Sequence, residues 1–496
     1  MSRVRHLLAR LGALTTGLVV CFWFIIALRA IPVPAGDYGM FVTVAERLKA
    51  GDRLYVDVYE NKDPFFHYAL ALGRSVTPYA GWILEVLWLL VASFSALSIA
   101  RAAGIAFRTS VILGFISVPA IMTGFTYFAG VSHLPGVALA ILSLALALRM
   151  RAVLAGLAVG SLLFVKLVMF PIGVLFVLMA FLMQSRLRLV AVAAISALGA
   201  IAVAVVLMVV RGEFLPYLAA LQDNAVYAGT QETSTGLSAA LEHLRKVLVP
   251  NNALLLVTTV ALVVAAAVMS RRVLKRSEDP IGAALAWSSL GATALALGVL
   301  SQTGLWVHHA QILVPGAALA LILFMARGPA FARGSSAIAI WTAIALAVPL
   351  TGLPSPRAYV TPVEYARAII WEQSRLAPST ELILSTGSPT TFARVGGGND
   401  GGFGRGLVEW TMVCPLFGQS TLTTPAKLAD MRDCLPRANV IFVDTDAVGG
   451  DTDSPWDEFI RGVEGLLASS YSCRVEPVGR ICVRTDYAAS AESLTE

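Results

Sequence analysis

Residues 110–129 read SVILGFISVPAIMTGFTYFA, and these 20 residues include no Asp, Glu, Lys or Arg. Two further stretches of the same kind are 251–270 (NNALLLVTTVALVVAAAVMS) and 281–300 (IGAALAWSSLGATALALGVL). A helix rises about 1.5 Å per residue, so about 20 residues cross a hydrocarbon core of about 30 Å. Since lipid offers the backbone no hydrogen-bond partners, such stretches must be helical. The sequence therefore predicts transmembrane helices.

The composition of the whole chain agrees with this interpretation. Apolar residues make up 57% of the 496 residues and charged residues only 14%, and the mean hydropathy is +0.75. Soluble domains usually carry about a quarter charged residues, so an ordinary soluble enzyme is excluded. We predict a polytopic α-helical membrane protein with about eleven spans, which are residues 10–30, 81–100, 110–129, 132–148, 152–165, 168–183, 188–210, 251–270, 281–301, 308–326 and 335–351.

Basic residues recur at every other turn between these spans. Apart from Arg3, Arg5 and Arg10 before the first span, they are Arg101, Arg108, Arg149, Arg151, Arg186, Arg188, Arg271, Arg272, Lys275, Arg276, Arg327 and Arg333. The positive-inside rule then predicts a cytoplasmic N-terminus and an extracytoplasmic C-terminal domain. Two short helices turning near Lys166 keep Arg151 and Arg186 on the same side, which favours eleven spans over ten.

Three segments lie outside the membrane in this topology: residues 31–80, 211–250 and the tail, residues 355–496. The tail holds 18 acidic and 12 basic residues, whereas residues 1–354 hold 13 acidic and 25 basic residues. Because the basic excess lines cytoplasmic turns, it does not indicate nucleic-acid binding. We expect a transmembrane module over 1–354 and an extracytoplasmic soluble domain over 355–496.

The tail has the pattern of a small α/β domain. Residues 362–376 show helical spacing, and the short apolar runs Glu381–Ser385, Val440–Asp444 and Arg480–Arg484 predict strands. It also holds four of the five cysteines, and an even number in an exported domain indicates disulfides. Three pairings are possible. We favour Cys473–Cys482, because Tyr471–Val483 reads as a hairpin, and this leaves Cys414–Cys434.

The first external segment concentrates the polar residues. It contains GDYG at 36–39, GDRLYVDVYENKDP at 51–64 and FFHY at 65–68. A connection between two membrane spans has no folding need for so many charges. A solvated loop is one interpretation, and a site at the membrane surface is the other, because ionisable groups at the edge of a bundle often line substrate paths.

This segment resembles the first external loop of the GT-C glycosyltransferases, which include protein O-mannosyltransferases, aminoarabinose transferases of lipid A and related lipopolysaccharide sugar transferases. The motifs are an acidic residue soon after the first span, LYVD at 54–57 and NKDPFFHY at 61–68. Residues 156–171 around Lys166 and the sequence WVHHAQILVP at 306–315 are also similar to segments of that family. An external α/β tail suits it as well.

The resemblance implies inverting transfer of a sugar from a polyprenyl-phosphate donor to a glycan, lipid or protein acceptor, at the outer face of a bacterial inner membrane. Asp37 is then the expected catalytic base. The expected ligands of the donor phosphate are Lys62, Lys166, His308 and His309, with Arg29 a weaker candidate. The expected contacts to acceptor or sugar are Tyr38, Asp57, Tyr59 and Glu60.

Each of these residues also has a plainer interpretation. Asp37 can cap the helix that starts near Gly39, and Lys62 can be a solvated or snorkelling lysine. A histidine pair at a membrane interface can serve as an anchor. Lys166 lies between two apolar stretches, where a charge is costly, so it is expected to meet a phosphate or a carboxylate such as Glu85.

The sequence departs from the family pattern at three places. Asp63 replaces the first proline of Lys-Pro-Pro, Tyr38 replaces a common second acidic residue, and His133 stands where many relatives carry an acidic residue. The motif therefore gives no support to a divalent metal and leaves the sugar open. A transporter or flippase for a lipid-linked sugar, or a non-catalytic membrane scaffold, remains the alternative function.

Overall fold

The computed structural model describes residues 2–30, 37–60, 62–77, 79–124, 132–230, 264, 267–268, 270, 278–301, 307–328, 380–383, 414, 425–444, 455–476 and 479–487. The chain divides into two compact units. Unit 1 comprises Met1–Ile31, Ile83–Val205 and Gln231–Pro354, and unit 2 comprises Pro32–Trp82, Val206–Thr230 and Ser355–Glu496. The contacts of the chain thus group the first external segment with the tail, whereas the sequence division at residue 354 stays a prediction.

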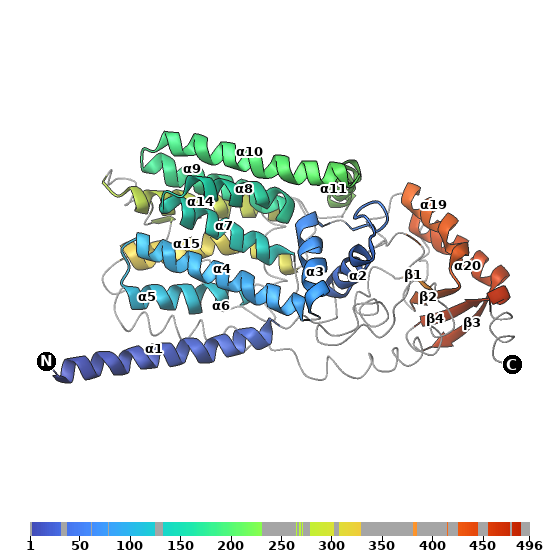
Figure 1. Cartoon of the computed structure of the whole chain (residues 1–496), viewed down its shortest axis with the longest axis horizontal. Helices are drawn as coiled ribbons and strands as arrows, with labels where there is room; N and C mark the ends of the chain where they lie inside the picture. Colours follow the sequence, from blue (N-terminus) through green and yellow to red (C-terminus); the bar gives the residue numbers. More distant parts are fainter. Residues whose placement is uncertain are drawn as a thin grey trace. The chain divides into compact units, whose positions relative to one another are not determined.

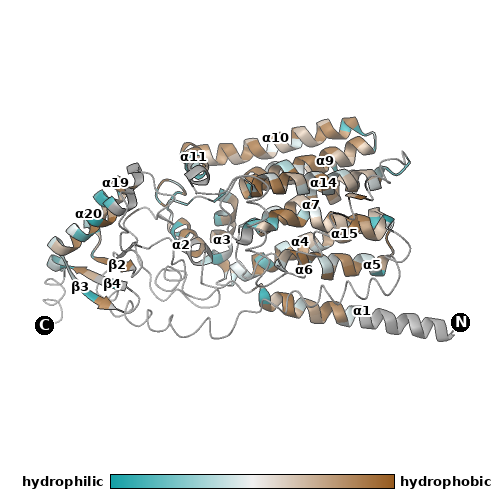
Figure 2. Ribbon diagram, turned by 180° about the vertical axis from the view of Figure 1, so that it is seen from behind, coloured by the Kyte–Doolittle hydropathy of each residue, from teal (hydrophilic) through white to brown (hydrophobic). Residues whose placement is uncertain are grey.

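Unit 1 is a bundle of apolar helices that lie side by side along one direction (Figure 1). Its helices are α1 (Ser2–Arg29), α4 (Ala80–Ala102), α5 (Phe107–Ile112), α6 (Val118–Gly124), α7 (His133–Leu148), α8 (Ala152–Val165), α9 (Phe170–Met183), α10 (Leu187–Val210), α14 (Pro280–Leu300) and α15 (Val314–Arg327). A π-helical turn, η1 (Leu113–Ser117), joins α5 to α6, and 3-10 turns η2 (Leu167–Met169) and η3 (Val307–Leu313) precede α9 and α15. Apolar residues dominate along the helices (Figure 2).

Five of the described helical segments are long and apolar enough to cross a membrane: Ala80–Ala102, Phe107–Gly124, Leu187–Val210, Pro280–Leu300 and His309–Arg327. Four shorter apolar helices are Thr15–Arg29, His133–Leu148, Ala152–Val165 and Leu167–Met183. These nine segments coincide with nine of the predicted spans. The other two, 251–270 and 335–351, lie almost entirely outside the described residues, so the total of eleven stays a prediction.

The chain turns at Lys166, as the distribution of arginines predicts. Lys166 has extended backbone angles between α8 and η2, and a proline stands near the start of α9. The two helices form a hairpin in which Gly173 packs beside Leu162. Because α8 and α9 run in opposite directions, Arg151 and Arg186 lie at the same end of the bundle, and Lys166 lies at the other end.

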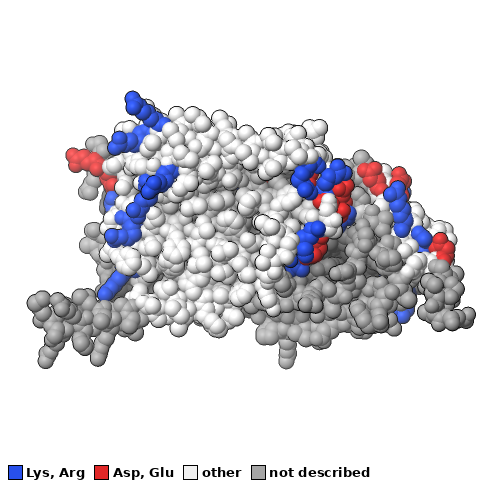
Figure 3. Space-filling view, in the orientation of Figure 1, with Lys and Arg blue, Asp and Glu red and all other residues white. Residues whose placement is uncertain are grey.

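Basic side chains gather at the end of the bundle where Arg151 and Arg186 lie. On the face shown in Figure 3, the sides of the bundle carry no charged side chains among the described residues. The exposed ones in unit 1 are Arg101, Arg108, Arg149, Arg151, Arg186, Arg188 and Arg327. Arg327 pairs with Asp279 through two hydrogen bonds of 2.5 and 3.0 Å and also donates to the carbonyl of Ala103. This end of α15 is therefore tied to the start of α14 and to the end of α4.

Unit 2 contains the first external segment and the tail. Its helices are α2 (Asp37–Ala50), α3 (Pro64–Val76), α11 (Phe214–Thr230), α19 (Pro425–Cys434) and α20 (Pro455–Ser470), with a 3-10 turn η7 (Leu435–Arg437) after α19. The strands are β1 (Thr380–Ile383), β2 (Val440–Asp444), β3 (Tyr471–Glu476) and β4 (Gly479–Arg484). The strands β1, β2 and β4 lie where the sequence predicts strands.

The tail forms a mixed sheet of order β1-β2-β4-β3, in which β1 and β2 are parallel and the other neighbours antiparallel. Buried side chains of α19 and α20, among them Met431 and Val463, lie in one hydrophobic core with Ile441 of β2. Two disulfides, Cys414–Cys434 and Cys473–Cys482, are present. The second joins directly opposed residues of β3 and β4. These are the pairs that the sequence favours.

Candidate functional site

A group of polar side chains is buried at the end of the unit 1 bundle where Lys166 lies. Arg29 at the end of α1 is only 5% exposed, Lys166 only 8% and His133 at the start of α7 only 3%. All three belong to helix ends remote from the basic turns. A charged side chain within apolar surroundings is expensive, so such groups usually mark a functional site.

The members of this group are connected by four contacts between residues that are otherwise close neighbours in sequence. Lys166 Nζ donates to Ser132 Oγ at 3.2 Å, and the ring of the next residue, His133, lies 5.2 Å from the ring of His309. Two residues further on, Gln311 donates to the carbonyl of Met122 at 3.4 Å. Arg29 Nη2 donates to the neighbouring carbonyl of Thr123 at 2.7 Å. We call Arg29, Ser132, His133, Lys166, His309 and Gln311 the basic cluster.

The backbone of α7 approaches Lys166 closely. A Cβ at Gly136 would lie 2.6 Å from Lys166 Cβ and 3.1 Å from Met169 Cγ. Both distances are shorter than ordinary van der Waals contact, and Lys166 Cβ cannot swing away as the tip of a side chain would. The absence of a side chain at Gly136 therefore allows Lys166 to lie against α7.

The π-helical turn η1 orients α1 beside α6. The indole nitrogen of Trp23 donates to the carbonyl of Phe115 within this turn at 2.9 Å, and its ring stacks edge-on with Phe115. A π-turn frees carbonyl groups from the regular helical pattern, so a side chain can bond to them. Trp23 and Arg29 thus fix α1 at two points, the first on η1 and the second on α6.

In unit 2, the predicted base Asp37 is the first residue of α2, and its side chain lies outside what the structure describes. Lys62 is half-buried and precedes α3. The hydroxyl of Tyr55 donates to the carbonyl of Lys62 at 2.6 Å. Tyr55 itself has φ 65°, a conformation that non-glycine residues adopt only when their surroundings hold them there.

Three carboxylates of unit 2 accept hydrogen bonds from tyrosines. Asp63 accepts from Tyr217 at 3.1 Å. Asp223 accepts from Tyr59 at 3.3 Å. Glu213, which is 1% exposed, accepts from the hydroxyl of Tyr68, from the amide of Leu54 and from Arg211. Together these bonds hold α11 and the residues just before it against residues 54–68. We call this set the acid–tyrosine network.

Burial raises the pKa of the tyrosines in this network, and the carboxylates raise it further. For Tyr217 the main cause is burial, followed by the charge of Asp63 and the hydrogen bond to it. For Tyr59 burial is again first, followed by the charge of Asp223. For Tyr68 burial is followed by the hydrogen bond to Glu213. The phenols are therefore held as neutral donors.

The predicted acceptor-binding residues occupy different surroundings. Tyr38 is 2% exposed and lies so close to Gly81 that a Cβ there would be 2.0 Å from its hydroxyl, which indicates a packing role. Asp57 forms an ion pair with Arg53 at 2.9 Å and also accepts from the amide of Arg53. Tyr59 belongs to the acid–tyrosine network, and the next residue, Glu60, is buried.

The structure thus brings two of the predicted phosphate ligands, Lys166 and His309, into the basic cluster, together with the weaker candidate Arg29. The side chain of His308 lies outside the described residues. The sequence interpretation missed Ser132, Gln311 and Tyr217, and it gave Glu213 no specific role beyond membership of the external segment 211–250. His133 was noted only as a departure from the family pattern. The signal for Glu213 was available, because it is a lone acidic residue directly after a long apolar helix.

The contacts of Asp63 account for an aspartate at a position where the family pattern has a proline. It stands at the N-cap position of α3, with Pro64 as the first helical residue, but its carboxylate makes no capping hydrogen bond. It accepts instead from Tyr217 on α11. A proline at position 63 would remove this link. Among the described residues, no three His, Cys, Asp or Glu side chains are grouped as ligands of a metal ion.

The apolar helices are those of a multi-pass membrane protein, and comparison with solved structures shows a GT-C-like fold. The structure is similar to ArnT from Cupriavidus metallidurans bound to undecaprenyl phosphate, with a TM-score of 0.64 and 12% identity over 97% of this chain and 98% of that chain. For ArnT in the apo state the TM-score is 0.61 and the identity 13%, over 97% and 99% of the two chains. ArnT is an aminoarabinose transferase of the GT-C superfamily.

The resemblance of the sequence to the GT-C glycosyltransferases is therefore confirmed at the level of the fold. No protein-family model matches the sequence, and no curated protein matches it.

We predict that Tyr217→Phe changes the response of stability to alkaline pH. The Tyr217 pKa is raised in the folded protein, so its contribution is complete below the ordinary tyrosine pKa of about 10 and is lost as the pH rises above that value. At pH 8 the variant should lose about 1 kcal/mol with the hydrogen bond to Asp63. Unfolding measured from pH 8 to about 11 should show a shallower alkaline decline for the variant, and equal declines would contradict the assignment.

Proposed function

We propose that this protein transfers a sugar, with inversion, from a polyprenyl-phosphate donor to an acceptor of the cell envelope. The observation that carries the proposal is the basic cluster. Two cationic side chains and two imidazoles, drawn from four segments of the chain, are collected at one end of an apolar bundle. Such a group favours an anion that arrives from the lipid. The similarity to ArnT bound to undecaprenyl phosphate supports the same ligand class.

The donor phosphate is assigned to Lys166, His309 and Arg29 of unit 1, together with His308. Lys62 of unit 2 is proposed as a further phosphate ligand on the resemblance of its motif to the GT-C family alone. As the bond between the anomeric carbon and the phosphate oxygen breaks, negative charge grows on the phosphate. Cations fixed in a site of low polarity stabilise that charge more strongly than water would, because they do not have to reorient. The leaving group is then the polyprenyl phosphate.

Asp37 is assigned as the general base. It takes the proton of the acceptor hydroxyl while the acceptor oxygen attacks the anomeric carbon from the face opposite the phosphate, so the configuration inverts. A hydroxyl is a weak nucleophile at neutral pH, and a positioned base typically contributes about 10²- to 10⁴-fold. Tyr59 and Glu60 are assigned to the sugar or the acceptor. For Tyr38 and Asp57 the contacts with Gly81 and Arg53 favour structural roles.

Charge and cysteine usage support the proposed location and orientation. The arginine-rich end of unit 1 belongs in the cytoplasm by the positive-inside rule. The basic cluster then lies at the outer side. The two disulfides of the tail suit an oxidising compartment, as expected outside the cytoplasm of a bacterial inner membrane.

The test uses purified protein in nanodiscs with a radiolabelled panel of polyprenyl-phosphate sugars and envelope acceptors. Transfer and release of lipid phosphate are measured for wild type, for Asp37→Asn and for a control, Asp430→Asn, which changes an exposed carboxylate on α19. We expect Asp37→Asn to lower transfer by about 10²-fold or more with donor binding retained, and Asp430→Asn to behave as wild type. Binding without turnover in the wild type, with donor moved across the bilayer, would favour a flippase instead.

A second prediction concerns the approach of α7 to Lys166. Gly136→Ala should displace Lys166 and weaken donor use about tenfold, since a misplacement of about 1 Å is costly in an active site. The matched control is Gly298→Ala on α14, where an added Cβ meets nothing within 4 Å. Alanine favours helix over glycine, so the control should be as stable as wild type or slightly more. Equal donor kinetics in the two variants would show that Lys166 is not a ligand.

A further inference from the structure

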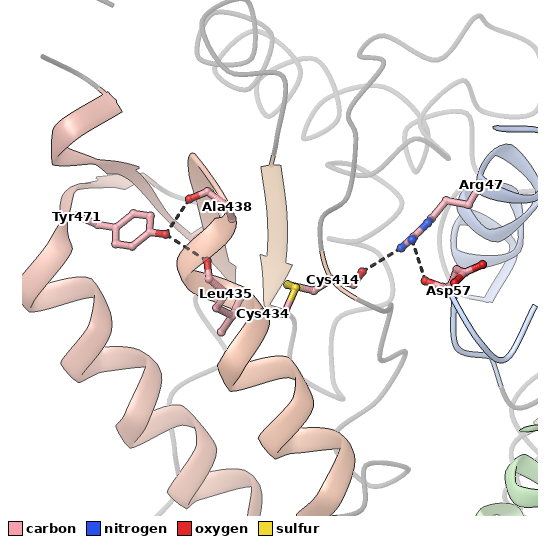
Figure 4. The surroundings of a disulfide bond; sticks show 7 residues. All are labelled: Arg47, Asp57, Cys414, Cys434, Leu435, Ala438 and Tyr471. Atoms are coloured by element: carbon pink, nitrogen blue, oxygen red, sulfur yellow. Dashed lines mark hydrogen bonds between the residues drawn. A yellow bond between two sulfur atoms is a disulfide. The ribbon is translucent and has the colours of Figure 1, made fainter. Parts of the chain in front are cut away.

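One guanidinium in unit 2 joins the tail to the first external segment. Arg47, in the last turn of α2, donates from Nη1 to the carbonyl of Cys414 at 2.9 Å and from Nη2 to the carbonyl of Asp57 at 2.8 Å (Figure 4). Its Nε donates to Asp52 at 2.5 Å in an ion pair. All three donor nitrogens of the fork are thus used, and only one of the three acceptors is charged.

The carbonyl of Cys414 is a fixed acceptor. Cys414 is fully buried and is bonded through its sulfur to Cys434, the last residue of α19. The segment after α19 is held in turn by Tyr471, whose hydroxyl donates to the carbonyls of Leu435 and Ala438 at 3.2 and 2.7 Å (Figure 4). The disulfide therefore attaches Cys414 to the hydrophobic core of the tail.

A chain of hydrogen bonds leads from Arg47 to Lys62. Arg47 holds the carbonyl of Asp57, and the carboxylate of Asp57 accepts from the amide and side chain of Arg53. The turn between them is closed by the bond from the Tyr55 amide to the carbonyl of Val58 at 2.7 Å. Within this turn Tyr55 keeps its left-handed conformation, from which its hydroxyl reaches the carbonyl of Lys62.

We infer that Arg47 is a positioning residue for Lys62, and that the Cys414–Cys434 disulfide acts on the site through it. The tail then has a defined task in the reaction: it presents the Cys414 carbonyl that orients the Arg47 guanidinium over residues 52–57. This rests on the proposed function only in the role of Lys62 as a phosphate ligand. The hydrogen-bonded chain itself lies within unit 2 and can be tested without turnover.

The chemistry of the side chain makes arginine specific at this position. A planar guanidinium presents donors in several fixed directions, whereas a lysine ammonium is a point charge on a flexible stem. Arg47→Lys retains the charge and the partner Asp52 but cannot bond both carbonyls with the same geometry. The variant therefore disrupts the two bonds to carbonyls, which couple the tail to residues 52–57, and retains the ion pair with Asp52.

The chain offers a matched control for the disulfide. Cys414→Ser with Cys434→Ser removes the bridge that holds the acceptor of Arg47. Cys473→Ser with Cys482→Ser removes the bridge between β3 and β4, which does not involve Cys414, the acceptor of Arg47. Both changes remove one disulfide from the tail, so a general loss of stability should affect the two variants alike.

The first measurement is the donor KM and kcat of the four proteins in nanodiscs. We expect Arg47→Lys and the Cys414/Cys434 variant to raise the donor KM about tenfold, and the Cys473/Cys482 variant to keep it within about twofold. Combining Arg47→Lys with the Cys414/Cys434 change should add little to the larger single effect, because both act through the same bonds. A fall in kcat alone at constant KM, or equal KM values in the two disulfide variants, would overturn the inference.

The second measurement is hydrogen exchange of residues 51–62, which needs no substrate. Exchange should be at least about fivefold faster in Arg47→Lys and in the Cys414/Cys434 variant than in wild type and in the Cys473/Cys482 variant. If the wild type transfers no sugar but exchange follows this order, the proposed function fails and the coupling stands. Uniform exchange across all four proteins would overturn the coupling, whatever the activity.

Discussion

The cost of placing cations inside an apolar helix bundle is the constraint on which unit 1 depends. A lysine or arginine at such a position costs several kcal/mol unless polar groups surround it. The bundle meets this cost by ending or breaking helices where the charges lie: α1 ends at Arg29, α7 begins at His133, and the α8–α9 hairpin turns at Lys166. Helix ends expose polar groups, and here Arg29 finds the carbonyl of Thr123 and Lys166 finds the hydroxyl of Ser132.

Unit 2 solves the complementary problem, which is to keep carboxylates near apolar surroundings. Its tyrosines are neutral donors that satisfy Asp63, Asp223 and Glu213 without adding charge. A network in which every member is bonded is rigid, whereas a partly satisfied one is costly. This rigidity allows residues 54–63 to hold a shape that Tyr55 would not adopt alone. The Arg47 fork and the disulfide-bonded tail extend the same support.

The sequence was sufficient to predict nine of the apolar helices, the turn at Lys166 and three strands, because these depend on local composition. Long uncharged runs must be helical in lipid, and the spacing of arginines favours a hairpin between 151 and 186. It was also enough to select Asp37, Lys62 and Lys166 as candidates, although the roles of these residues stay proposals. The pairing of His133 with His309, or of Asp63 with Tyr217, joins residues more than 150 positions apart, and no local pattern indicates it. The π-turn beside Trp23 was equally hidden within a uniform apolar run.

The most direct test of the basic cluster is equilibrium binding of a labelled polyprenyl phosphate, compared with the same polyprenol lacking phosphate. The comparison isolates the anion, because both ligands offer the same apolar chain to the bundle. Binding should require the phosphate and should weaken at least about tenfold in Lys166→Met, but remain unchanged in Arg188→Met, which removes an exposed arginine from the opposite end. Equal binding of the alcohol and the phosphate, or equal effects of the two substitutions, would contradict a phosphate site in unit 1.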